Sequence, residues 1–348
     1  MPSTSKRSAS GGQPLTAAEI AELAGVSVAT VSKVLNGKSN VAAPTRLLVE
    51  GVINKHGLRR RRRPAPAAPL VEVVLNVLGG SYAMEIIAGV ERAVRPHQLA
   101  VVVSGLDGAE SPGDEWMKQM LVRRPAGIIT VFCSPTAEQR EQLRARDIPF
   151  VVVDPVVEPG GAPSVAVTNW SGGLEAARHL VELGHRRIGV IAGPPGVLAS
   201  RARLDGYRAA LDEAGIPWEP DLIRTGEFRA AAGVTGAREL LTRADPPTAI
   251  FAFSDPLAVG VYQVANELGV RIPEQLSVVG YDDTAPGTWL HPPLTTVRQP
   301  LAEMAEDAAA IIMALARGES PARTRIVLAT ELIVRASTAP PAGQTPLS

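Results

Sequence analysis

The chain has 348 residues, of which 45% are hydrophobic and only 4% aromatic, enough for a small module and a larger globular domain. Its single cysteine, Cys133, excludes a disulfide framework and any metal site built from several thiolates, and favours a reducing compartment. No apolar run approaches the ~18 residues of a membrane span, and no apolar signal segment opens the chain. These features predict a cytoplasmic protein with no membrane partner.

The formal net charge is zero, but the charges are unevenly distributed. Residues 1–63 hold 11 Lys and Arg against 3 Glu, a charge of +8, and the remainder holds 24 against 32, a charge of −8. A basic N-terminal segment on an acidic body indicates a polyanionic partner for that segment alone.

The N-terminal segment favours three short helices. Residues 1–13 are polar and Gly/Ser-rich, so we expect a disordered tail. A module over 14–58 follows, with a helix over 16–24 that begins at a capping box of Thr16 and Glu19. Gly25 favours a tight turn, Ser27 caps a helix over 28–35, and a third helix covers 43–56.

A basic and proline-rich segment, residues 59–69, separates this module from the rest. Its prolines remove backbone donors and predict an extended linker. From residue 70 to 337, apolar β runs alternate with helical segments, the pattern of an α/β doubly wound fold. The expected strands cover 71–78, 99–105, 127–132, 149–154, 187–193, 249–254 and 277–282. The expected helices include 84–95, 174–183, 201–214, 233–243 and 257–268.

The length of this core favours two subdomains facing each other across a cleft. We expect an N-subdomain of about 70–168 plus 298–325 and a C-subdomain of about 169–297 plus 326–337. The Pro-rich residues 338–348 predict a disordered C-terminal tail.

The helix pair joined by a glycine turn is typical of a helix-turn-helix, whose second helix enters the major groove of DNA. Its exposed face carries short side chains, so the backbone can approach base edges. Val28 and Ala29 suit a thymine methyl, and Lys33 can donate to guanine. Hydroxyls suit phosphate oxygens. The candidate DNA contacts of the module are Thr16, Ser27, Val28, Ala29, Thr30, Ser32, Lys33 and Asn36.

The stretch AEIAELAGVSVATVSKVLNGKSNV resembles the headpiece of the LacI/GalR family of bacterial transcription regulators. The resemblance extends over about residues 15–337, through NWSGG, HLVELGHRRIGVIAG, SRARLDGY, FSDPLAVGV, IPEQLSVVGYDD and PPLTTVRQP. It implies a homodimer on a two-fold symmetric operator and a periplasmic-binding-protein-like core that senses a small effector. The linker and the segment SYAMEIIAGVERA resemble actinobacterial members associated with plant-polysaccharide sugars, xylo-oligosaccharides among them. A purine or another small polar ligand is the alternative effector.

Two positions depart from the family pattern. Lys33 stands where the family often has arginine, and lysine lacks the rigid two-pronged fork that discriminates bases. The linker has five arginines where members usually carry a hinge helix with a minor-groove leucine. We expect Arg59, Arg60, Arg61, Arg62 and Arg63 to contact phosphates or enter a narrow minor groove, although a solvated spacer remains the alternative.

A sugar site needs charged groups for hydroxyl pairs and an aromatic plate for the C–H face. Asp154 and Asp282 end predicted strands, and Arg203 lies in SRARLDGY, three residues before Gly206. The resemblance places Arg203 and Asp282 at effector-gripping positions and Phe228 at an aromatic stacking position. Lower-ranked candidates for the same cleft are Ser81, Tyr82, Asn169 and Ser254.

Other polar residues favour structural roles. Asp255 is expected to cap a helix, Cys133 to be a core thiol and His185 to be structural, whereas Trp170 either packs or closes over a ligand. The histidines have no metal-ligand spacing, and no nucleophile elbow, Walker loop, HExxH or GxGxxG after a strand occurs. No cofactor, metal or catalytic residue is therefore expected.

The resulting interpretation is a ligand-responsive, DNA-binding repressor of sugar-utilisation genes, associated with the nucleoid. Whether the effector releases DNA or promotes its binding is open. The alternative is a sugar-binding protein of the transport class, which needs a secretion signal and no basic module. A sugar-processing enzyme is a third possibility, and it predicts turnover of the bound ligand.

Overall fold

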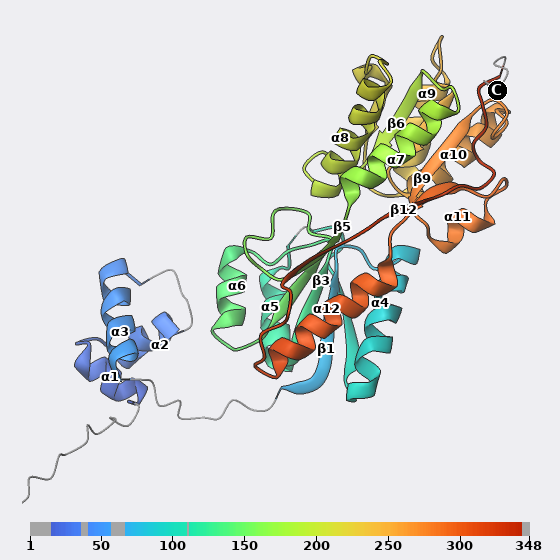
Figure 1. Ribbon diagram of the computed structural model, residues 1–348. Coiled ribbons are helices and arrows are strands. Elements are labelled where there is room, and N and C mark those ends of the chain that lie inside the picture. The colour runs from blue at the N-terminus through green and yellow to red at the C-terminus, as the bar shows by residue number, and fades with distance from the viewer. Residues whose placement is uncertain (1–14, 36–40, 57–66, 110, 343–348) are drawn as a thin grey trace, which may run out of the picture.

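The computed structural model describes residues 15–35, 41–56, 67–109 and 111–342. Helices α1 (Ala17–Leu23), α2 (Val28–Leu35) and α3 (Ala43–His56) form an N-terminal headpiece, which confirms the predicted helix-turn-helix. In Figure 1 these helices lie apart from the α/β core. Gly25 makes the turn between α1 and α2 with a φ of +64°, which costs glycine little.

The headpiece is held by local caps and a small apolar core. The capping box predicted for α1 is present, because Thr16 N donates to Glu19 Oε2 at 2.6 Å and Glu19 N donates to Thr16 Oγ1 at 3.4 Å. Ser27 Oγ accepts from Thr30 N at 3.1 Å at the start of α2. The buried core consists of Ile20, Ala21, Ala24, Val31, Val34 and Val49.

The N-subdomain contains a sheet in the order β11-β5-β4-β3-β1-β2, and every pairing in it is parallel. Its strands are β1 (Ala68–Leu75), β2 (Ala100–Gly105), β3 (Pro125–Val131), β4 (Phe150–Val153), β5 (Ser164–Val167) and β11 (Arg325–Leu328). Its helices are α4 (Ser81–Val94), α5 (Asp114–Arg123), α6 (Ala137–Arg144) and α12 (Leu301–Ala316), with a 3-10 turn at Arg95–His97. Buried valines and isoleucines on both faces explain the continuous apolar runs.

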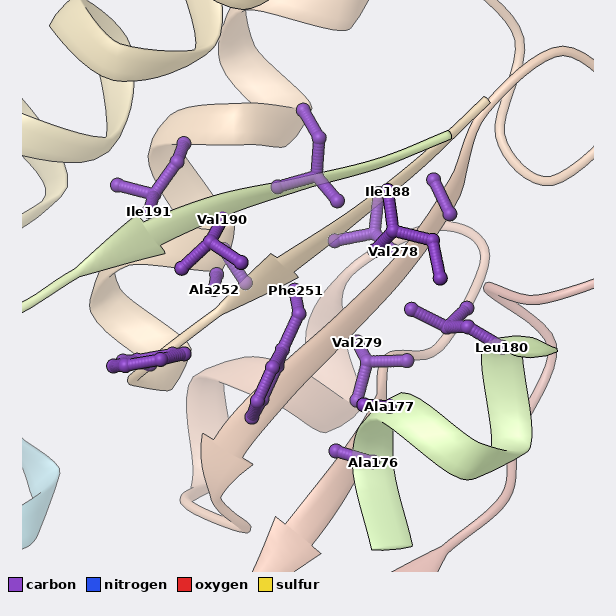
Figure 2. Packing of buried hydrophobic residues seen from close by; sticks show 14 of the residues in the cluster. Ala176, Ala177, Leu180, Ile188, Val190, Ile191, Phe251, Ala252, Val278 and Val279 are labelled. Carbon is purple, nitrogen blue, oxygen red and sulfur yellow. The ribbon is translucent and has the colours of Figure 1, made fainter. Parts of the chain in front are cut away.

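The C-subdomain repeats this design with the order β12-β10-β9-β8-β6-β7. Its strands are β6 (Ile188–Ala192), β7 (Ile223–Thr225), β8 (Ala249–Ala252), β9 (Ser277–Asp282), β10 (Thr295–Arg298) and the antiparallel edge strand β12 (Glu331–Ile333). Its helices are α7 (Asn169–Glu182), α8 (Leu198–Glu213), α9 (Ala230–Leu241), α10 (Asp255–Leu268) and α11 (Ala285–Trp289), with a 3-10 turn at Pro220–Leu222. Figure 2 shows α7 packing Ala176, Ala177 and Leu180 toward the apolar side chains of β6, β8 and β9.

Three short connections join the subdomains. They run from β5 to α7, from β10 to α12 and from β11 to β12, so both subdomains are built from separated stretches of chain (Figure 1). The structure corrects the expected boundaries. Strand β11 pairs with β5, so residues 326–328 belong to the N-subdomain, and Arg298 lies in β10 of the C-subdomain.

The two ends of the predicted core also differ from the structure. Strand β1 begins at Ala68, two residues inside the expected linker, where Ala68 pairs with Pro125. Residues 338–342 are described and packed rather than disordered. Ala339 N donates to Ser277 Oγ at 3.0 Å, and Ala339 O accepts from the same hydroxyl at 2.9 Å. Residues 1–13 and 59–63 lie outside the described residues.

Candidate DNA-binding and effector sites

The exposed face of α2 carries the predicted base contacts. Val28 is 51% exposed, and Ala29 and Lys33 are exposed beside it, whereas Val31 and Val34 are buried against α1 and α3. Small side chains on the outer face leave the helix backbone accessible to a groove. The structure therefore gives α2 the flat, singly charged surface expected from its sequence.

The predicted phosphate contacts differ in availability. Ser27 and Ser32 are exposed, but Thr30 is half-buried with its hydroxyl 2.9 Å from Ser27 Oγ. Thr16 Oγ1 donates to Glu19 Oε2 at 2.7 Å, so its hydrogen can reach a phosphate only if that bond opens. Asn36 and the five linker arginines lie outside the described residues.

The predicted effector residues meet around Arg203, which is buried on α8 at 2% exposure between the subdomains. Its Nε donates to Asn169 Oδ1 at 2.8 Å, and its Nη1 donates to the carbonyl of Phe253. The guanidinium carbon lies 3.5 Å from the ring centroid of Tyr281 and 5.9 Å from that of Phe228. Stacking on aromatic rings partly replaces the water that a buried guanidinium loses.

Two buried carboxylates face this single cation. Asp154 directly follows β4 in the N-subdomain, where Tyr82 Oη donates to its Oδ2 at 3.3 Å. Burial raises the pKa of Asp154, while Arg203 and the hydrogen bonds from Tyr82 and Asn169 oppose that rise. Asp282 ends β9 in the C-subdomain, and burial raises its pKa well above the ordinary value despite the attraction of Arg203.

The remaining candidates occupy positions close to this centre. Ser254 follows Phe253 and caps α10, because its Oγ accepts from Leu257 N at 3.4 Å. Ser81 is half-buried at the first residue of α4, next to Tyr82. The structure thus brings one cation, two carboxylates, an amide and an aromatic ring together from both subdomains.

One aromatic residue of this region is absent from the sequence prediction. Phe132 follows β3, and its ring meets that of Phe228 edge-on across the two subdomains, with centroids 5.5 Å apart at 82°. Its φ of +54° is rare for an aromatic residue and turns the side chain out of the strand direction. A backbone hydrogen bond also joins the two subdomains close to this ring pair, from Leu198 N to Val156 O at 3.0 Å.

The expected helix cap at Asp255 is wrong. Ser254 caps α10, and the fully buried Asp255 carboxylate instead accepts from Thr284 N at 2.7 Å, Thr284 Oγ1 at 3.0 Å and Thr296 Oγ1 at 2.6 Å. The carboxylate therefore fixes Thr284, two residues after Asp282, to the start of α10 and to Thr296 of β10. Asp283 is also structural, since it pairs with Arg298 at 2.7 Å and with Arg335 at 2.5 Å.

Burial raises the pKa of Asp255 to about 6, above the ordinary 3.8. The unfolded chain therefore releases this proton before the folded chain does, and this group makes stability fall as pH rises from about 4 to about 6. We expect Asp255→Asn, which cannot ionise, to gain stability relative to the parent over that range and to run parallel to it above pH 7. Urea unfolding at stepped pH measures this difference, and curves that stay parallel from pH 4 to 6 contradict it.

Other single residues are confirmed as structural. Cys133 is fully buried, and burial raises its thiol pKa to about 12. His185 is buried between Thr248, Ser277 and the carbonyl of Ala339, at 2.8 to 3.0 Å. Trp170 is 46% exposed, and its role, packing or closing over a ligand, stays a prediction. Among the described residues, no cluster of His, Cys, Asp or Glu can hold a metal ion, and no helix is long and apolar enough to cross a membrane.

A headpiece of this shape on a two-subdomain core defines a class of protein, the DNA-binding regulator with an attached ligand sensor. Comparison with known proteins gives the same result. Residues 16–60 match the family described as bacterial regulatory proteins, lacI family, and residues 177–338 match a periplasmic binding protein-like domain.

Full-length relatives show the same arrangement of domains. The chain is 32% identical to the HTH-type transcriptional regulator CelR of Thermobifida fusca over 91% of this chain and 96% of CelR. It is 33% identical to the regulator MalR of Streptomyces coelicolor (strain ATCC BAA-471 / A3(2) / M145) over 94% and 97% of the two chains. The chain belongs to the LacI family of bacterial transcriptional regulators, and it is not an enzyme.

Solved structures agree with this assignment. A CelR–cellobiose complex superposes with a TM-score of 0.71 at 32% identity, covering 93% of this chain and 99% of that chain. The lac repressor dimer bound to operator and the anti-inducer ONPF superposes with a TM-score of 0.68 at 28% identity, covering 94% and 100%.

Proposed function

We propose that the chain is a homodimeric repressor of sugar-utilisation genes whose operator binding is controlled by a sugar held between the two subdomains. The observation that carries this proposal is the Arg203 centre, where Asp154 and Asp282 from opposite subdomains face one guanidinium beside Phe228. The carboxylates can accept hydrogen bonds from sugar hydroxyls, the guanidinium can donate to hydroxyl oxygens, and the ring matches an apolar C–H face.

The site also suggests how binding is transmitted. A ligand that touches Asp154 and Asp282 at once favours one arrangement of the subdomains over others. In a dimer, that arrangement sets the spacing of the two headpieces and hence their fit to two half-sites. A coupling of about 1–3 kcal/mol is enough for a usable switch.

The relatives support the effector class. A similar structure contains cellobiose, another contains ribose, and the lac repressor structure is a dimer on its operator. Membership of this family also supports a cytoplasmic, nucleoid-associated location. A transport-class binding protein is disfavoured, because the helix-turn-helix headpiece has no role in one.

The test is a mobility shift on promoter DNA from the chain's own locus, with random duplex of equal length as the control. A panel of cellobiose, maltose, ribose, xylobiose and glucose is added to the DNA assay and to thermal unfolding of the free protein. We expect operator preference at physiological salt and at least one sugar that raises the melting temperature and changes operator affinity. No operator preference with or without these sugars contradicts the proposal.

A further inference from the structure

Two arginines, Arg124 and Arg146, lie at the end of the N-subdomain where the core begins. Arg124 is the left-handed C-cap of α5 and leads into β3, and Arg146 lies in the turn between α6 and β4. Ala68, the first residue of β1, donates from its N to the carbonyl of Arg124 at 2.8 Å and pairs with Pro125. In Figure 1, β1 begins at the end of the N-subdomain that lies away from the C-subdomain. The linker therefore joins the core directly beside this arginine pair.

Within the described residues, neither arginine of the pair forms an ion pair. The preceding residue, Arg123, does form one, with the buried Glu72 at 2.6 Å. Arg146 donates from Nη1 to the carbonyl of Gln142 at 3.2 Å, a bond that leaves its charge uncompensated. Both Arg124 and Arg146 are half-buried, so water screens their charges only in part.

The two guanidinium groups also lie close enough to repel each other. Burial lowers the pKa of Arg146 below its ordinary value, and the charge of Arg124 lowers it further. Asp147 follows Arg146 and is exposed, but in the part of the chain that the structure describes no ion pair joins it to either guanidinium. An anion that contacts both groups relieves this repulsion. A phosphate suits that role, because guanidinium binds phosphate through paired hydrogen bonds.

The position of the linker indicates DNA as the source of that phosphate. Residues 57–67, between α3 and β1, include five arginines and span at most about 40 Å even when fully extended. When the headpiece is on DNA, the arginine pair is therefore held near the duplex at a high effective concentration. The linker arginines repel the pair, so they cannot neutralise it themselves.

We propose that Arg124 and Arg146 form a direct contact between the core and DNA, in which they bind backbone phosphates of the operator beyond those that the headpiece contacts. The inference rests on the proposed operator binding. The contact adds affinity without reading sequence, because backbone phosphates are the same at every base pair. It also attaches the duplex to the N-subdomain itself, in addition to the headpiece and the linker.

The test is the double variant Arg124→Asn/Arg146→Gln. Asparagine tolerates the left-handed backbone of Arg124, where φ is +51°, and glutamine retains most of the stem of arginine. Operator affinity is measured by fluorescence anisotropy at a series of salt concentrations. The pair supplies two phosphate contacts in each protomer of a dimer, so the magnitude of the slope of log affinity against log salt should fall by about 3.6. Operator affinity at about 50 mM salt should fall at least tenfold.

Arg186→Gln/Arg243→Gln is the matched control, because it removes the same charge at the far end of the C-subdomain. Arg186 precedes β6 and Arg243 precedes β8, whereas Phe253, directly after β8, bonds Arg203 at the opposite end of that sheet. The control should have the salt slope of the wild type. Both double variants should retain the sugar-induced thermal shift, since neither alters the Arg203 centre. If Arg124→Asn/Arg146→Gln does not fold, Arg146→Gln alone should lower the slope by about 1.8.

A wild-type salt slope in the folded variant overturns the core contact and leaves the proposed function intact. An equal fall in the control also overturns it, because the effect would then reflect the net charge of the chain and not a contact. If the wild-type chain shows no operator preference, the proposed function itself fails, and this inference fails with it.

Discussion

Arg203→Ala should abolish the sugar-induced thermal shift and weaken sugar binding at least about 100-fold. The substitution removes the only guanidinium shown to face Asp154 and Asp282, so two buried carboxylates lose their common cation. Removing one partner from a buried charge pair costs about 3–5 kcal/mol, part of which will appear as lower stability of the free protein. Calorimetry with the best panel sugar measures the loss of affinity.

Measuring operator affinity distinguishes a defect in the effector site from a defect in the headpiece. Arg203→Ala should bind operator without sugar as the wild type does, and the sugar should no longer change that affinity. Arg208→Ala is the control on the same helix, since Arg208 stacks on Trp218 at 4.0 Å instead of entering the centre. Arg203→Lys retains the charge but not the fork, and it should remain impaired. A full sugar response in Arg203→Ala would refute the site.

Replacing Arg59, Arg60, Arg61, Arg62 and Arg63 with serine should lower operator affinity by orders of magnitude at low salt. Each phosphate contact contributes about 0.9 to the magnitude of the slope of log affinity against log salt, so five contacts in one protomer would contribute about 4.5. Fluorescence anisotropy over a salt series measures that slope, on operator and on random duplex.

Lysine at all five positions is the matched control, because it retains the charge and loses the planar fork. Its salt slope should equal that of the wild type. A loss of affinity that occurs only for operators with A·T-rich flanks would indicate that the arginines enter a narrow minor groove. An unchanged slope in the serine variant would show that the segment is a solvated spacer.

The sequence predicts most of the strands inside the two sheets, and all the strands that it misses have at most four residues. The strand prediction covers β1–β4, β6, β8 and β9, and all of these except the edge strand β2 consist mostly of buried apolar residues. It omits β5, β7, β10, β11 and β12, which have three or four residues each. Three of these, β7, β11 and β12, lie at sheet edges, where one side faces solvent and the apolar signal is weak. The omission of β11 explains the misplaced boundary near residue 326.

The site shows a similar limit. Arg203, Asp154 and Asp282 are predictable because a motif or a strand end marks each of them. Phe132 carries no such mark, and its place in the site depends on a left-handed backbone turn that becomes visible only in three dimensions. Gln299 lies inside PPLTTVRQP, one of the stretches that carry the resemblance, but its hydrogen bond to Asp282 becomes visible only in the structure. Asp255 was predicted to cap α10 because it stands directly before a proline near the start of a helix. The structure shows that the cap is the preceding residue, Ser254.

The position of the last strands has a consequence for synthesis of the chain. Strands β11 and β12 complete the edges of the two sheets, and the segment after β12 packs on β9, where Ser337 is fully buried and its Oγ donates to Val278 O at 2.6 Å. The headpiece needs only the first sixty residues or so. During translation it is therefore complete long before the sensor can close. A nonsense mutation between β11 and β12 would release a fragment that contains the headpiece but lacks the last strand of the second sheet and Ser337, which the sensor needs.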